Sequence, residues 1–134
     1  MIVKAFDMQA GTNEQAFTDV DNEHWAKEFI DTAVSNGVIA GIGDEKFGLG
    51  MDISRQDAAV IIARVAQKYE IALNEDSEAD FTDEEYFASY AQESIIKLAK
   101  SGIISGMGNG EFGAKASITR AQCAIIISKL LALR

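Results

Sequence analysis

The chain contains one segment twice. Residues 25–62, moved by 65 positions, fall on residues 90–127 without a gap. Because a duplicated unit of this size rarely encloses a complete core, each copy is expected to bury its apolar face against a neighbour. Functional residues should therefore recur in both copies or line a groove between them. The matched positions are Gly37 and Gly102, Gly41 and Gly106, Gly43 and Gly108, Phe47 and Phe112, Ile53 and Ile118, and Arg55 and Arg120.

Composition and charge exclude several functional classes. Of 134 residues, 48 % are hydrophobic and 25 % are charged, which is typical of a globular protein. A net charge of −9 does not provide the basic surface that nucleic acids and anionic membranes attract, so we expect no nucleic-acid partner. No apolar run approaches the ~20 residues of a membrane span, so we expect no membrane insertion. Cys123 is the only cysteine, and its apolar neighbours indicate a buried, unreactive thiol.

Each copy has the pattern helix, glycine loop, helix, which predicts an all-α fold. The first helices are expected over residues 22–36 and 90–101, where apolar residues recur with a 3.6-residue period. The second helices are expected over 55–69 and 120–133. The last of these is apolar on most of its circumference and is predicted to lie centrally. Trp25 begins the first apolar stripe, which favours a place in the core over a surface role.

The glycine loops, residues 41–48 and 106–113, permit two interpretations. A glycine-rich loop can hold phosphate, but neither loop has the lysine and hydroxyl residue of a nucleotide-binding loop, and no apolar strand precedes either. The alternative is a tight turn whose glycines adopt positive φ and whose phenylalanine enters the core. The pattern favours the turn.

Comparison with the EF-hand motif disfavours a calcium-binding loop. Residues 19–23 place oxygen ligands at alternate positions, but an EF-hand then needs a glycine and an acid where His24 and Ile30 stand. The second copy loses the alternation at residues 83–86. His24 has no second imidazole to pair with and is expected to be an exposed residue of the first helical turn. We therefore expect no metal and no cofactor.

The sharpest signal is a tetrad that recurs at residues 54–57 (Ser-Arg-Gln-Asp) and 119–122 (Thr-Arg-Ala-Gln). A hydroxyl residue followed three positions later by an acid or amide is a capping box that begins a helix. The box does not explain the two arginines, because a cation in the first turn faces the positive end of the helix dipole. An anion should compensate each of them. That anion is either a carboxylate of the chain, such as Asp19 or Asp83, or a carboxylate or phosphate of a ligand.

These features together resemble S-layer homology (SLH) repeats. The first copy is similar from Phe17-Thr18-Asp19 to its tetrad, and the second from Phe81-Thr82-Asp83 to its own. The family's hallmark tetrad, Thr-Arg-Ala-Glu, is varied in both copies, and its usual proline after the loop phenylalanine is missing. The resemblance implies repeats that pack through a central helix bundle around a pseudo-threefold axis, which is incomplete here.

The resemblance also divides the chain. We expect residues 1–12 to be the tail of a preceding repeat, residues 13–76 to be one complete repeat and residues 77–134 a second. Residues 1–6 are similar to parts of both second helices, so the chain is expected to be a fragment of a larger exported protein. Without a complete third repeat, apolar surface should be exposed, and a homo-oligomer or a domain swap is expected to cover it.

The function implied by the resemblance is that of a non-catalytic, extracellular module that anchors proteins on the bacterial cell wall. Its implied partner is secondary cell-wall polysaccharide, bound through a pyruvylated sugar in grooves between repeats. The alternative is a structural module that mediates self-association without a glycan site. An enzyme is disfavoured because no paired carboxylates and no nucleophile–base pair recur.

The site residues follow from the same resemblance. Two arginines would pair with the pyruvyl carboxylate, two aspartates would accept sugar hydroxyls, and two aromatic residues would line the groove beside two glycines. In that order the positions are Arg55 and Arg120, Asp19 and Asp83, Trp25 and Tyr90, and Gly41 and Gly106.

Overall fold

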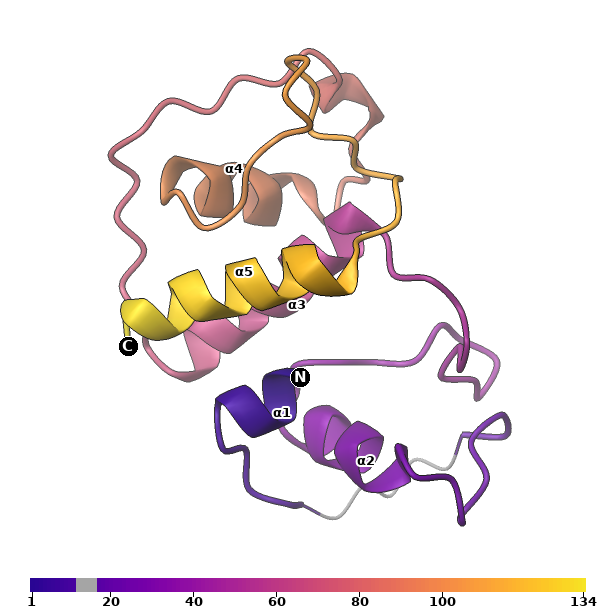
Figure 1. The fold of residues 1–134 in the computed structure, drawn as a ribbon. Coiled ribbons are helices and arrows are strands. Elements are labelled where there is room, and N and C mark those ends of the chain that lie inside the picture. The colour runs from indigo at the N-terminus through magenta and orange to yellow at the C-terminus, as the bar shows by residue number, and fades with distance from the viewer. Residues whose placement is uncertain (12–16) are drawn as a thin grey trace. The chain divides into compact units, whose positions relative to one another are not determined.

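The structure, a computed structural model, describes residues 1–11 and 17–134 (Figure 1). These residues form α-helices and one short 3-10 helix but no β-strand, which confirms the predicted all-α fold. The chain divides into two compact units, Met1–Met51 and Asp52–Arg134. The second helix of the first copy thus folds with the second copy. The expected border between residues 12 and 13 lies outside the described residues, and the three expected segments remain a prediction.

Unit 1 contains α1 (Ile2–Ala5) and α2 (Lys27–Ser35), which pack against each other. Helix α2 ends where the sequence predicts, because Asn36 caps it and Gly37 adopts a φ of 72°. It begins five residues later than the expected start at residue 22. His24 lies in the turns before the helix, half-buried, and its Nδ1 accepts the N–H of Ala26 at 3.1 Å.

Trp25 corrects one expectation. It precedes α2, so the helical period that suggested a core position does not extend to it, and its side chain is 80 % exposed. The core of unit 1 is instead formed by Phe17, Val20 and Ile30, with Phe47 packed against them.

Unit 2 contains α3 (Arg55–Lys68), the 3-10 helix η1 (Glu84–Tyr86), α4 (Gln92–Lys100) and α5 (Arg120–Ala132). The bounds of α3 and α5 agree with the expected ones to within one residue. Both begin at the predicted caps: Ser54 accepts the N–H of Asp57, and Thr119 and Gln122 form a complete capping box.

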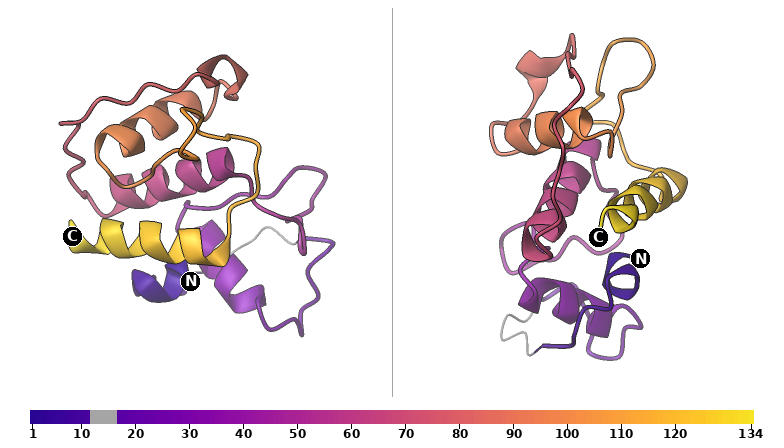
Figure 2. Two further views of the ribbon diagram at one scale, coloured as in Figure 1. Left: turned by 45° about the horizontal axis from the view of Figure 1, so that its top comes forward. Right: turned by 90° about the vertical axis from the view of Figure 1, so that its left-hand side faces the viewer.

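Helix α3 is the centre of unit 2, and the prediction that α5 would be central is wrong. Helix α3 packs against both α4 and α5, as the views in Figure 2 also show. Helix α5, which α3 contacts, buries Ile126, Ile127 and Leu130. The opposite face of α5 is exposed, and Ile125 is 57 % exposed.

The glycine loops are turns, as expected. Phe112 is completely buried, and its ring centroid lies 5.4 Å from that of Phe81 and 5.6 Å from that of Phe87. A Cβ on Gly106 would lie 2.7 Å from the carbonyl oxygen of Glu111, so the close approach of the loop's two arms requires glycine there. Gly41 is confined in the same way by the carbonyl of Lys46.

Two aspartates fix these loops from outside. The carboxylate of Asp19 accepts the backbone N–H groups of Phe47, Gly48 and Leu49 at 2.8–3.0 Å. Asp83 accepts those of Phe112 and Gly113 at 2.9 Å. Converging backbone N–H groups of this kind form an anion site, and here the chain's own carboxylate fills it. A phosphate therefore has no place in either loop.

The first tetrad fastens α3 to the second copy. The Nε of Arg55 donates to the carbonyl of Phe112 at 2.9 Å, its Nη2 donates to that of Ser105 at 2.5 Å, and the guanidinium lies 4.7 Å from the centre of the Phe112 ring. The Oε1 of Gln56 accepts the N–H of Ala88 at 3.0 Å. Asp57 accepts the hydroxyl of Tyr90 at 2.7 Å. We call these contacts of residues 55–57 the tetrad clamp.

Replacing Arg55 with alanine should lower the free energy of unfolding by roughly 2–3 kcal/mol, because hydrogen bonds from a charged donor are lost and buried carbonyls lose their partner. Arg120→Ala is the matched control. Arg120 occupies the same helix position but is exposed, so its loss should change stability by no more than about 0.5 kcal/mol. Thermal and urea unfolding followed by circular dichroism measure both. Equal losses of unfolding free energy in the two variants would contradict a stabilising role of Arg55 in the tetrad clamp.

Acid should release the loop of unit 1. The N–H of Phe47, followed by those of Leu49 and Gly48, lowers the pKa of Asp19. A carboxyl group whose folded pKa lies below its unfolded value of about 3.9 stabilises the fold above that value, and the contribution disappears as the pH falls through the folded pKa. NMR should therefore show the amide signals of residues 47–49 titrating together below about pH 4. In Asp19→Asn this shared titration should be absent, and if it persists, another group controls the loop.

Candidate ligand-binding site

A groove of about 660 Å³ lies within unit 2. Its walls are the second half of α3 (residues 60–67), the segment that follows α3 (residues 71–75) and residues 90–97, which include the first turns of α4. These segments can be followed in Figure 2. Since α3 belongs to the first copy and α4 to the second, this groove lies between repeats, where the sequence led us to look.

The side chain of Tyr90 is an exposed aromatic group in the lining of the groove. Tyr90 is 62 % exposed, although it lies at the start of an apolar helix pattern. Its hydroxyl donates to Asp57, and this hydrogen bond raises the pKa of Tyr90. The bond keeps the phenol neutral and fixes the direction of its ring, so that a flat apolar face is presented to solvent.

A smaller hollow of about 440 Å³ recurs at the equivalent place in unit 1. The 65-residue shift relates four lining positions of one hollow to four of the other. Each has an exposed aromatic residue and, three positions later, a glutamate. The related pairs are Ala10 and Glu75, Trp25 and Tyr90, Glu28 and Glu93, and Thr32 and Lys97. A duplicated surface hollow with an exposed aromatic residue is not explained by core packing.

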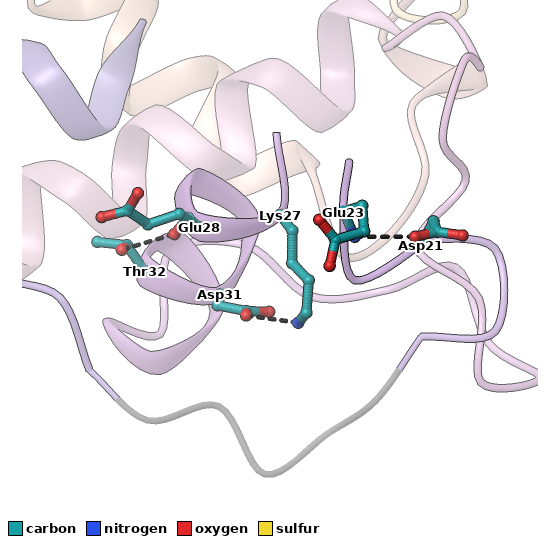
Figure 3. Close-up of polar contacts among 6 residues, drawn as sticks. All are labelled: Asp21, Glu23, Lys27, Glu28, Asp31 and Thr32. Carbon is teal, nitrogen blue, oxygen red and sulfur yellow. Dashed lines mark hydrogen bonds and ion pairs between the residues drawn. The ribbon is translucent and has the colours of Figure 1, made fainter. Parts of the chain in front are cut away.

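Two polar side chains of the unit 1 hollow, Lys27 and Thr32, are paired within the unit (Figure 3). The Nζ of Lys27 lies 2.6 Å from the Oδ2 of Asp31. The hydroxyl of Thr32 donates to the carbonyl of Glu28 at 2.7 Å. Lys27 is thus neutralised by Asp31, whereas among the described residues the carboxylate of Glu28, which also lines this hollow, has no such partner.

The groove of unit 2 differs in its charges. Arg64 and Lys97 reach it from α3 and α4, together with Glu75 and Glu93. Within residues 1–11 and 17–134, neither cationic side chain has a hydrogen bond or an ion pair. Sequence reasoning missed both residues: the 65-residue shift relates Lys97 to Thr32, and it relates Arg64 to Lys129, beyond the matched segment.

The expected site residues fall into two groups. Trp25 and Tyr90 line the two hollows. Gly41 and Gly106 hold the loops closed and are absent from both linings, and Asp19 and Asp83 bind loop N–H groups. The roles of these residues toward a ligand remain predictions.

The two arginines of the tetrads have different environments. Arg55 is only 3 % exposed and burial lowers its pKa, whereas Arg120 is exposed. The alternative in which Asp19 or Asp83 neutralises them is wrong, because backbone carbonyls receive Arg55 and loop N–H groups occupy both carboxylates. The side chain of Arg120 has no partner in the described part of the chain.

Other chemistry finds little support. Cys123 is half-buried, and burial raises the pKa of its thiol, which suppresses the reactive thiolate. Among the described residues, no three His, Cys, Asp or Glu side chains gather as a metal ion would require. None of the described helices combines the length and apolar character that crossing a bilayer demands.

Comparison with known proteins identifies the same family that the sequence motifs resemble. The S-layer homology domain family matches residues 16–59 and 80–124, more than half of the chain. An endoglucanase of Bacillus sp. (strain KSM-635) is 26 % identical over 98 % of the chain, and exoglucanase XynX of Acetivibrio thermocellus is 30 % identical over 98 %. An S-layer protein of Bacillus licheniformis is 28 % identical over 84 %.

The chain spans only a small part of these relatives: 14 % of the endoglucanase and 12 % of each of the other two. The enzymes among them are thus matched only through their S-layer homology regions. The chain belongs to the S-layer homology domain family, whose repeats are non-catalytic modules that anchor proteins to the cell surface.

Proposed function

We propose that this chain attaches a larger exported protein to secondary cell-wall polysaccharide, with sugar rings held in the groove of unit 2 and the hollow of unit 1. The observation that carries the proposal is the recurrence of these hollows around Trp25 and Tyr90, which are 80 % and 62 % exposed. An exposed aromatic face beside carboxylates suits a sugar, because the ring covers apolar C–H groups and the carboxylates accept hydroxyl protons.

The size of the groove agrees with this function. Ligand sites in proteins are concave and commonly enclose about 300–1,000 Å³, with a few polar groups that set orientation. The groove of unit 2, at about 660 Å³, has room for a short saccharide. Its floor is apolar at Ala66 and Ile71, which are both buried. A pyruvylated sugar, which the family relationship suggests, would add a carboxylate to the recognised group.

Removal of either aromatic side chain should weaken wall binding. Tyr90→Ala and Trp25→Ala should each reduce affinity roughly tenfold, or about 1.4 kcal/mol, as expected for an aromatic anchor. Tyr90→Phe keeps the ring and should lose much less. The assay is co-sedimentation of the chain with purified Bacillus licheniformis walls, before and after extraction of their polysaccharide.

Tyr86→Ala is the matched control for these variants. Tyr86 is 64 % exposed in the same unit but lies outside the groove, so its removal should leave sedimentation unchanged. Binding that survives polysaccharide extraction, or that falls equally in Tyr86→Ala, contradicts the proposed function.

The exposed face of α5 favours a second candidate function, self-association. Ala121, Ala124 and Ile125 are exposed there, and Arg120 lacks the partner carbonyls that its counterpart Arg55 has. A homo-oligomer or a domain swap would cover this face.

Light scattering across a range of concentrations tests this second candidate. Association should increase with concentration and should be abolished by Ile125→Glu, which places a charge on the exposed apolar face. Ile42→Glu, at a position that is 59 % exposed in the loop of unit 1, should leave association intact. A monomer at every concentration would exclude self-association and leave wall binding unaffected.

A further inference from the structure

The cations of the groove, rather than the buried Arg55 of the first tetrad, are in a position to recognise an acidic group. Arg64 and Lys97 project from different helices and line the same groove, and Tyr90 lines it beside them. The tetrad residue Arg55 belongs to the same unit but is only 3 % exposed and holds two backbone carbonyls. A ligand could compete for Arg55 only by breaking the tetrad clamp.

Both cations carry charge without an internal counterion. Lys97 lies in the last turn of α4, where the helix C-terminus favours positive charge, and Arg64 lies in the second half of α3. Neither side chain is paired within residues 1–11 and 17–134, although Glu75 and Glu93 line the same groove. In unit 1 the Nζ of Lys27, which lines the hollow, is held by Asp31 at 2.6 Å. The two hollows therefore differ in the charge they offer a ligand.

We propose that Arg64 and Lys97 bind the carboxylate of an acidic saccharide whose ring rests on Tyr90, and that the hollow of unit 1 lacks this selectivity. This inference rests on the proposed function and adds the residues that choose the ligand. The guanidinium fork matches a carboxylate in two parallel hydrogen bonds, and the ammonium adds a point charge. Glu75 and Glu93 accept hydroxyl protons from the sugar and repel a second acidic group.

The test compares two sugars that differ in one group. The first is the methyl glycoside of N-acetylmannosamine with a 4,6-pyruvyl ketal, and the second is its 4,6-isopropylidene ketal, in which a methyl group replaces the carboxylate. Calorimetric titration of the intact chain should give a preference for the acid of roughly tenfold or more. In the double variant Arg64→Gln, Lys97→Gln that preference should fall to near unity, while binding of the isopropylidene sugar is retained.

Three matched variants complete the design. Lys68→Gln removes a charge from α3 outside the groove, and Lys27→Gln removes the cation of the unit 1 hollow; both should keep the preference. Arg120→Gln should also keep it. Each replaced side chain is exposed or already paired on the surface, and circular dichroism melting confirms that the variants fold.

Several results would overturn the inference. They are an unchanged preference in the double variant, a preference lost in Arg120→Gln instead, equal loss of both sugars in the double variant, and no binding of either sugar by the unaltered chain. Sedimentation of the unaltered chain with extracted and unextracted walls is measured separately. If wall binding persists while one of these results is found, the selectivity of Arg64 and Lys97 fails and the anchoring function stands.

Discussion

The interaction on which unit 2 depends is the bond between Arg55 and two carbonyls of the second glycine loop. One guanidinium holds Ser105 and Phe112, lies over the Phe112 ring, and fixes the loop against the start of α3. Desolvating an arginine costs free energy, and the two charge-assisted hydrogen bonds and the aromatic face offset that cost. With Gln56 and Asp57 engaged as well, the first copy determines where the second copy's loop and aromatic residue lie.

This arrangement connects stability to the candidate site. Asp57 is both the acid of a helix cap and the acceptor that orients Tyr90, so the same carboxylate serves the fold and the groove. Asp83 accepts N–H groups of the same loop whose carbonyls Arg55 binds. Many residues that repeat thus build the unit, whereas the repeated Trp25 and Tyr90 and the surface residues beside them are exposed to a ligand. Arg64 and Lys97 belong to this second kind.

Much of the fold could be predicted from local patterns. The second helices, their caps and the glycine turns follow from short-range signals, namely capping residues, a 3.6-residue period and glycines with positive φ. The apolar period gave wrong predictions at two places, Trp25 and α5. Trp25 lies before the first turn of α2, so its agreement with the helical period had no structural meaning. The mostly apolar circumference of α5 suggested a central place, yet part of this helix, including Ile125, is exposed.

The sequence by itself determined the helix class, the duplication and the family, because these depend on the order of residues along the chain. It also predicted an anionic partner for each of Arg55 and Arg120, which is wrong for Arg55. Only the tertiary structure decided that carbonyls rather than carboxylates receive Arg55, and that Asp19 and Asp83 serve the loops. It also brought Arg64 and Lys97 to one groove. The reason is that these partners lie up to 57 residues apart, and only packing brings such distant groups within hydrogen-bonding distance.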